Sequence, residues 1–302
     1  MAQILVVDDS ATVRNEVSSF IKSHGMTVEV AVDGNDYGFT IVSNDAAGNT
    51  STSPCSAIIR IDTTPASGAT TLAWTETTPH SGLSVNSTWT SSADGDESNE
   101  TIRIYANDAS CSGTPFETQT LASGTGGANF ANGIDGVTYT FSILTTDNAG
   151  NSQTSTCSAG LLLDTTSPNA STALTWAESS PSKNLTVNAN WTLSNSTDIT
   201  SQSIQFYSNA TCSTTIGSSI SLGTGTLSQS FTGLNATTYA YIVTTTDNAG
   251  NSQASACSSS MLLDNVAPIA PTPTNFAEGI INNATSITSR WTLGGPADVA
   301  SH

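Results

Sequence analysis

Short runs in which apolar and polar residues alternate recur along most of the chain. Clear examples are residues 185–193, 203–207 and 239–243, and Gly, Asn and Ser residues separate the runs. Alternation with a period of two is typical of strands that bury one face, and the intervening residues favour turns. The sequence therefore predicts a mainly β fold built from antiparallel sandwiches. Beyond residue 34 we identify no convincing amphipathic helix.

The alternating pattern repeats itself about every hundred residues. The sequence Asp-x-Ala-Gly-Asn occurs at 45–49, 147–151 and 247–251, with offsets of 102 and 100 residues. The five tryptophans follow the same period, and Phe276 stands where a sixth would be; they are Trp74, Trp89, Trp176, Trp191 and Trp291. We expect the aromatic side chains to fill sandwich cores rather than to bind a ligand. A period near 100 residues is the size of one immunoglobulin-like domain.

Segments with Asp, Thr and Pro mark the predicted linkers between repeats, because these residues break regular structure. They begin at Asp62, Asp164 and Asp264. We predict two whole sandwiches, residues 63–164 and 165–264. Residues 35–62 then hold the last strands of a truncated repeat, and residues 265–302 hold the first strands of another. We expect the chain to be partial or chimeric, through recombination, a cloning junction or a sequence-assembly error.

The segments Ile134–Tyr139 and Gly233–Tyr239 occupy the same place in successive repeats and resemble the tyrosine corner of fibronectin type III domains. Together with the Asp-x-Ala-Gly-Asn turn and the linkers, they make the repeats similar to bacterial immunoglobulin-like modules of envelope proteins and adhesins. The resemblance implies a structural or adhesive role outside the cell or at its surface. It also implies contacts with neighbouring repeats and with other surface or matrix molecules.

Residues 1–34 follow a different pattern. An apolar run at 4–7 ends in Asp8 and Asp9, a helical spacing of apolar residues follows, and residues 28–32 alternate again, which predicts a β-α-β fragment. This fragment resembles the start of a CheY-like response-regulator receiver domain. The resemblance implies that Asp8 and Asp9 bind Mg²⁺ and that the chain acts in a phosphorelay. The family's phosphoacceptor aspartate has no counterpart here, so we favour two solvated acids and keep the phosphorelay function as the alternative.

The cysteines also follow the repeat. Cys111 and Cys157 are 46 residues apart, Cys212 and Cys257 are 45 apart at equivalent places, and Cys55 is left over. Constant spacing predicts one disulfide in each sandwich, and four buried free thiols are the alternative. Disulfides require an oxidising compartment. We therefore expect an extracellular or cell-surface location for the repeats, or a cytoplasmic one if the N-terminus is genuine, because the sequence has no signal peptide.

Aspartates in the turns and linkers are candidate Ca²⁺ ligands. They are Asp45, Asp62, Asp147, Asp164, Asp247 and Asp264. Immunoglobulin-like arrays that this chain resembles sometimes bind Ca²⁺ at such junctions, and Ca²⁺ takes six to eight oxygen ligands. The alternative, which we favour, is that each aspartate closes a turn by bonding its own backbone.

Charge, hydropathy and the absence of catalytic motifs in the sequence argue against three classes of function. The chain has 24 acidic and 6 basic residues, a net charge of −18, which argues against nucleic-acid binding. The longest apolar run is far too short to span a membrane. The sequence holds no nucleophile elbow, phosphate loop or paired catalytic carboxylates, so we expect no enzymatic activity.

Overall fold

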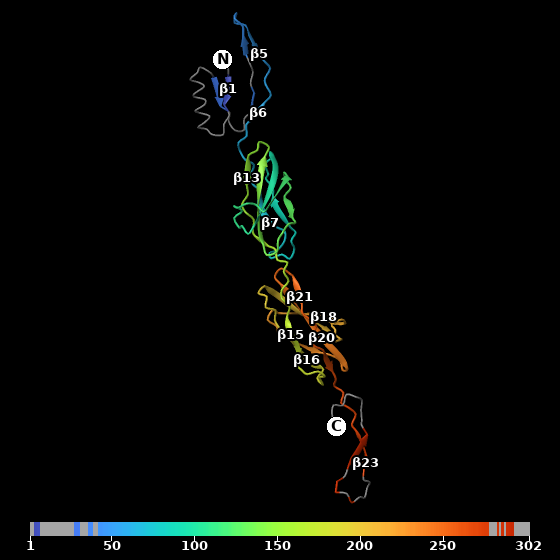
Figure 1. Ribbon diagram of the computed structural model, residues 1–302. Helices are drawn as coiled ribbons and strands as arrows, with labels where there is room; N and C mark the ends of the chain where they lie inside the picture. Colours follow the sequence, from blue (N-terminus) through green and yellow to red (C-terminus); the bar gives the residue numbers. More distant parts are fainter. Residues whose placement is uncertain are drawn as a thin grey trace. The chain divides into compact units, whose positions relative to one another are not determined.

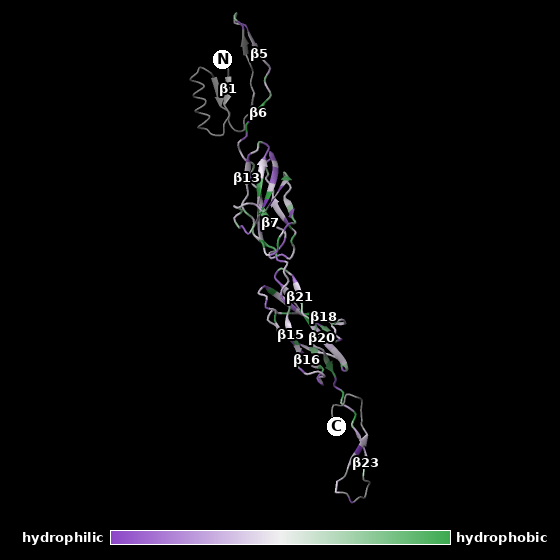
Figure 2. Cartoon of the chain, in the orientation of Figure 1, coloured by the Kyte–Doolittle hydropathy of each residue, from purple (hydrophilic) through white to green (hydrophobic). Residues whose placement is uncertain are grey.

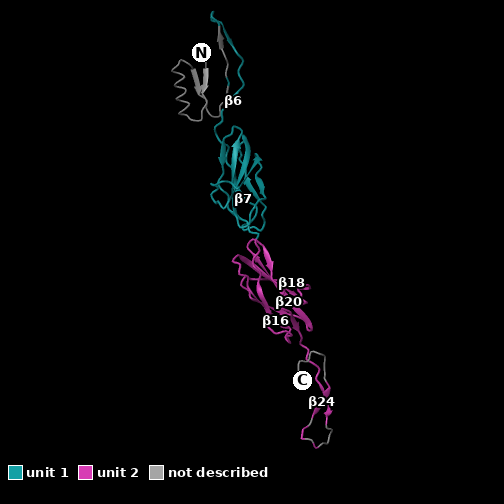
Figure 3. Cartoon of the chain, viewed as in Figure 1, with its two compact units in different colours: residues 1–165 teal, residues 166–302 magenta. Residues whose placement is uncertain are grey.

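The chain folds into two compact units, residues 1–165 and 166–302 (Figure 3). The computed structural model describes residues 3–6, 27–30, 36–38, 42–277, 283, 285–286 and 288–292. All regular elements in these ranges are β-strands, labelled in Figure 1, as the alternating pattern predicts. The division falls one residue after the linker boundary expected at 164.

Unit 1 contains a sandwich of two antiparallel sheets. The smaller sheet has the order β11-β8-β7, and the larger has the order β10-β9-β12-β13, with β14 also paired to β12. The strands of the smaller sheet are β7 (Thr70–Trp74), β8 (Val85–Thr90) and β11 (Gly127–Phe130). Those of the larger sheet are β9 (Glu97–Ala106), β10 (Glu117–Ala122), β12 (Thr138–Asp147), β13 (Ser152–Thr154) and β14 (Leu161–Leu162).

Unit 2 repeats this plan strand for strand. Its smaller sheet has the order β15-β16-β19, and its larger sheet has the order β18-β17-β20-β21, with β22 also paired to β20. The smaller sheet consists of β15 (Thr172–Trp176), β16 (Thr186–Thr192) and β19 (Ser228–Thr232). The larger consists of β17 (Ile199–Tyr207), β18 (Thr215–Leu222), β20 (Thr237–Asp247), β21 (Ser252–Ala254) and β22 (Met261–Leu263).

The inward residues of the alternating runs form the two cores. In β8, Val85, Ser87 and Trp89 are buried while the residues between them are exposed. Figure 2 shows both hydrophobic and hydrophilic stretches on the strands of the two sandwiches. Each sandwich has its own cluster of buried side chains, with Trp89 in the first and Trp191 in the second. Burying one large apolar side chain contributes about 1.5–3 kcal/mol, so each core can support its own sandwich.

The predicted tyrosine corner forms in both units. The hydroxyl of Tyr139 accepts a hydrogen bond from the backbone N–H of Ile134 (3.2 Å), and that of Tyr239 accepts one from Leu234 (2.7 Å). At Gly233 an added Cβ would lie 2.5 Å from the Tyr239 ring. Only glycine therefore allows the loop to pass this close to the ring.

The remaining described strands lie outside the two sandwiches. β1 (Gln3–Val6) and β2 (Thr27–Val30) pair in parallel, close to the two strands expected in the N-terminal fragment. The expected helix between them lies outside the described residues. Two short antiparallel pairs follow. They are β3 (Asp36–Tyr37) with β6 (Ile59–Arg60), and β4 (Val42–Asn44) with β5 (Thr50–Thr52).

In unit 2, β23 (Thr272–Phe276) pairs with β24 (Ser289–Thr292). The sequence predicts that Trp291 fills a core like the other tryptophans, and this prediction is wrong for the structure described. Phe276 and Trp291 are each 50% exposed, because their two strands form a two-stranded sheet with no described sheet packed against it.

Candidate metal centre

Each Asp-x-Ala-Gly-Asn segment is a turn closed by its own aspartate. Oδ1 of Asp147 accepts hydrogen bonds from the backbone N–H groups of Ala149 (2.9 Å) and Asn151 (2.8 Å). Its Oδ2 accepts one from the Asn151 side-chain amide (2.9 Å). Asp45 and Asp247 make the equivalent bonds in their own turns. The turn-closing alternative therefore describes all three residues.

Asp147 is 2% exposed at the end of β12. Burial by itself would raise the pKa of its carboxyl group. The hydrogen bonds from Asn151, and those from the backbone of Gly150 and Ala149, outweigh burial, so the pKa lies below the usual value for aspartate. A buried negative charge therefore stands at this end of the first sandwich at neutral pH.

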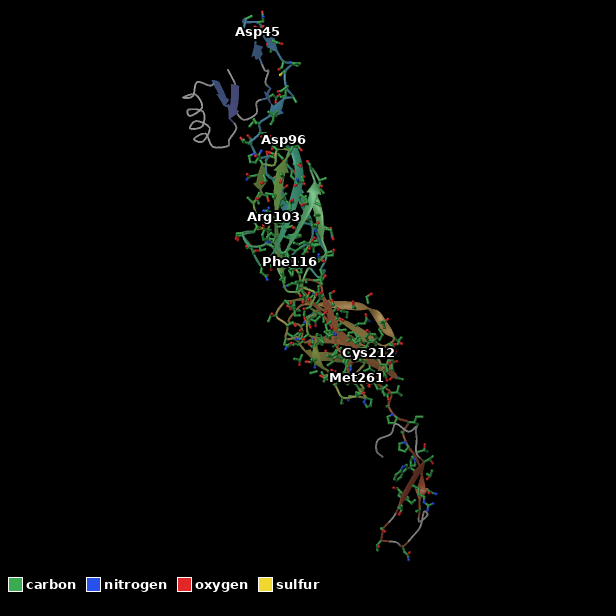
Figure 4. All side chains as sticks on the ribbon, turned by 45° about the horizontal axis from the view of Figure 1, so that its top comes forward. Asp45, Asp96, Arg103, Phe116, Cys212 and Met261 are labelled. Carbon is green, nitrogen blue, oxygen red and sulfur yellow. A yellow bond between two sulfur atoms is a disulfide. The ribbon has the colours of Figure 1, made fainter. Side chains whose placement is uncertain are left out.

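Two more carboxylates lie beside Asp147. Carboxylate oxygens of Asp62, Asp96 and Asp147 all lie within 4.8 Å of one another. Asp62 comes from the linker before the sandwich, where its backbone carbonyl accepts a hydrogen bond from the Asn151 amide (3.1 Å). Asp96 directly precedes β9, and its carbonyl accepts one from the Asn148 N–H (2.9 Å). Figure 4 labels Asp96 at one end of this sandwich.

Chemically, this arrangement suits a hard cation. Three carboxylates at this separation repel one another, and a divalent cation among them would offset the repulsion. Ca²⁺ takes six to eight oxygen ligands at variable geometry and accepts water among them. Both oxygens of Asp147 accept turn hydrogen bonds, and Oδ1 of Asp62 accepts one from the Thr64 N–H (3.1 Å). The exposed Asp96 therefore offers the most free coordination capacity, together with Oδ2 of Asp62.

Of the sequence candidates, the structure brings Asp62 and Asp147 together. Asp96 is an additional ligand candidate that sequence reasoning missed. A signal was present, since Asp198 follows it at the repeat spacing, and both residues accept a backbone hydrogen bond from the residue after the turn aspartate (2.9 Å each). An aspartate that recurs just before a long strand deserved the same weight as those in the turns.

Asp164 and Asp264 each follow the last strand of a sandwich. Asp164 follows β14 in unit 1, where its N–H donates to the His80 carbonyl (2.9 Å). Asp264 follows β22 in unit 2, where its N–H donates to the Ser182 carbonyl (2.8 Å). Asp8 and Asp9, the candidate Mg²⁺ ligands, lie outside the described residues.

Both predicted disulfides are confirmed. Cys111 bonds to Cys157 with 5.6 Å between the Cα atoms, and Cys212 bonds to Cys257 with 5.9 Å. Cys157 lies in the stretch between β13 and β14, where two serine hydroxyls accept hydrogen bonds from β12 backbone N–H groups at 2.9 Å. Each disulfide thus ties this irregular edge to the loop after the long central strand. Cys55 is free and exposed.

Comparison with known proteins gives a fold likeness only. No family model and no curated protein sequence matches the chain. Among solved structures, it is similar to the chicken CNTN1 FN1-FN3 domains at 14% identity and a TM-score of 0.41, covering 75% of each chain. It is similar to a two fibronectin type III domain segment from chicken tenascin at 12% identity and a TM-score of 0.30, covering 64% of this chain and 99% of that one.

The chain is also similar, at equally low identity, to a solved bacterial structure. The fibronectin(III)-like modules of Clostridium thermocellum CbhA are 14% identical with a TM-score of 0.37, covering 64% of this chain and 94% of that one. The sheet orders, the tyrosine corners and the two cores of the structure itself establish the tandem sandwich fold.

Proposed function

We propose that this chain is a non-catalytic structural or adhesive part of an extracellular or cell-surface bacterial protein. The observation that carries the proposal is the repetition of one complete sandwich, each copy with its own core and its own disulfide. Structural disulfides persist in oxidising compartments and are rare in the cytosol. The described residues contain no helix long and apolar enough to cross a membrane.

The acidic composition supports a role in contact with water and other macromolecules. A net charge of −18 on a chain with few basic residues keeps copies of the protein apart and in solution. The partners that this role requires are surface or matrix molecules.

The state of the cysteines in protein from its natural source tests the compartment. Alkylation without reductant, followed by mass spectrometry, should modify Cys55 and leave the other four cysteines unmodified. Alkylation of all five would contradict an oxidising location. Labelling of intact cells with a membrane-impermeant reagent provides the second measurement, since a surface protein is labelled and an internal one is protected.

As part of this proposal, Ca²⁺ binds at Asp62, Asp96 and Asp147 and stiffens the end of the first sandwich. Adding Ca²⁺ to EDTA-treated protein should raise the melting temperature, and the combined Asp62→Asn and Asp96→Asn substitutions should reduce that shift. These two residues are preferable to Asp147, because changing Asp147 would also break its turn. Identical melting curves in EDTA and in excess Ca²⁺ would exclude the calcium site.

A further inference from the structure

The second sandwich has a buried glutamine whose polar groups are all satisfied. Gln202 in β17 is 3% exposed, and its Oε1 accepts a hydrogen bond from the Trp191 indole (3.1 Å). Its amide nitrogen donates to the backbone carbonyls of Gly223 (3.2 Å) and Thr224 (2.7 Å). The side chain therefore uses both its acceptor and its donors inside the sandwich.

Glu100 is the equivalent residue of the first sandwich, and it leaves an oxygen atom unsatisfied. It is 0% exposed, and its Oε1 accepts a hydrogen bond from the Trp89 indole (2.9 Å). Its Oε2 is buried and has no hydrogen-bond partner. The Gln202 amide donates hydrogen bonds to two carbonyls, but an ionised carboxylate has no N–H group and cannot do so. A buried group of acceptors alone is costly unless a donor or a cation joins it.

Other buried oxygen atoms without a partner belong to the same sandwich as Glu100. Three of them are Ser91 Oγ, Glu97 Oε1 and Thr145 Oγ1. Thr145 is 0% exposed and lies directly opposite Glu100 in the pairing of β12 with β9. Glu97 lies three residues before Glu100 in β9 and pairs with Asp147 of β12 in the same ladder.

The second sandwich shows that these four positions share one space. Their counterparts there all line a single cavity of about 200 Å³. These counterparts are Leu193, Ile199, Gln202 and Thr245. The Thr245 hydroxyl has a hydrogen-bond partner in Ser171 (3.3 Å), whereas Ala69 stands at that position in the first sandwich. In the second unit this space has no charged lining residue, and its glutamine and Thr245 have hydrogen-bond partners. In the first unit the equivalent positions hold two acids and oxygen atoms without a partner.

We infer that the first sandwich binds a divalent, oxygen-preferring cation of the Ca²⁺ type between Glu97 and Glu100. The hydroxyls of Ser91, which directly follows β8, and of Thr145 in β12 supply neutral oxygen ligands. Two carboxylates balance the charge of one divalent ion, and such ions select carboxylate and neutral oxygens. These four residues differ from Asp62, Asp96 and Asp147, so the inference does not depend on the proposed calcium site of the turn.

Terbium luminescence can test this site separately, because the Trp89 indole donates to Glu100 and so lies beside the ion. Tb³⁺ replaces Ca²⁺ and emits when a neighbouring tryptophan is excited. The full chain, treated with EDTA and then freed of it, would be titrated with Tb³⁺ by luminescence and with Ca²⁺ by calorimetry. The test variant is Glu97→Ile with Glu100→Gln, which introduces the residues of the second sandwich. The matched control is Asp62→Asn with Asp96→Asn.

The expected result is that the test variant loses one equivalent of bound Ca²⁺ and about tenfold or more of the luminescence. The control should keep most of the luminescence, even where it loses the Ca²⁺ equivalent of the turn site. Failure of one site therefore differs visibly from failure of the other.

A reciprocal variant guards against misfolding of the test variant. Leu193→Ser, Ile199→Glu and Gln202→Glu together should give the second sandwich one new Ca²⁺ equivalent. Unchanged Ca²⁺ stoichiometry and luminescence in the test variant would overturn the inference. It would also be overturned by carboxyl carbon NMR that shows a protonated Glu100 at pH 7 in saturating Ca²⁺, because the space then holds a proton instead.

Discussion

The two sandwiches have one framework and different polar interiors. Sheet order, tyrosine corner, turn and disulfide recur in both. Gln202 and Tyr241 of the second unit stand at the repeat positions of Glu100 and Phe141 of the first. The backbone plan thus tolerates a change of a buried polar group, provided that something satisfies that group locally. Each unit serves as the control for the other.

Removal of a disulfide should cause the largest loss of stability, and the loss should be equal in the two units. Replacing both cysteines of one pair by serine removes a cross-link that closes a loop of 46 or 45 residues. The chain-entropy model gives a loss of about 4 kcal/mol in each case. Hydrogen exchange of the full chain, measured on peptides from each unit, would follow the loss. If only one of the two cysteine-pair variants lost stability in its own unit, the two disulfides would not be equivalent and the shared framework would be contradicted.

Tyr241 should show an intermediate effect confined to the second unit. Its hydroxyl donates to the carbonyls of Thr175 (2.8 Å) and Asn190 (2.6 Å), which joins β15 to β16 from the opposite sheet. Burial raises the pKa of Tyr241, consistent with a hydroxyl that stays protonated. Tyr241→Phe should destabilise unit 2 by about 1–2 kcal/mol, because a buried hydrogen bond is lost.

Phe141→Tyr in the first unit is the matched control for that substitution. In unit 1 the equivalent acceptor is the Ala73 carbonyl, which already accepts a hydrogen bond from the Thr88 hydroxyl (3.4 Å). A tyrosine hydroxyl introduced at position 141 would therefore compete with Thr88 for this carbonyl. It should change the stability of unit 1 by less than Tyr241→Phe changes that of unit 2. The same exchange measurement applies, and equal effects would show that the hydroxyl bridge contributes nothing specific.

The framework was predictable because its signals are periodic. Apolar alternation, the tryptophan spacing and the constant distance between cysteines all report on a repeated unit, and none requires knowledge of distant contacts. Trp291 is the exception. Its position in the repeat predicts burial, but burial depends on a second sheet packed against its own strand.

The polar interior was harder to predict, since it depends on which residues meet across sheets. Asp96 approaches Asp62 and Asp147 only through the fold, from positions 34 and 51 residues away in the sequence. Glu100 carried a readable signal, because it shares the inward register of Ile102 and Ile104 in β9. An acid in that register was a reason to look for a buried site, although only the structure identifies its neighbours.

The smallest expected difference is in the stability of the loops that carry the first cysteine of each disulfide. We expect this difference only at acidic pH. Asp108 in unit 1 accepts hydrogen bonds from Ser110, Ser112 and Gly113, while Asn209 holds the same place in unit 2. The Ser110 hydroxyl, followed by the backbone N–H groups of Gly113 and Ser110, lowers the pKa of Asp108 to about 2.

A lowered carboxyl pKa stabilises the folded loop above the unfolded value of 3.8, and this contribution is lost as the pH falls toward about 2. Hydrogen exchange of residues 108–113, corrected for intrinsic rates, should therefore speed up between pH 4 and pH 2. The loop at 209–214 should not change, since an amide does not titrate in this range. Asp108→Asn should remove the pH dependence from the first loop. If that variant kept the acid response, the cause would lie in other carboxylates of unit 1 and not in this difference between the two sandwiches.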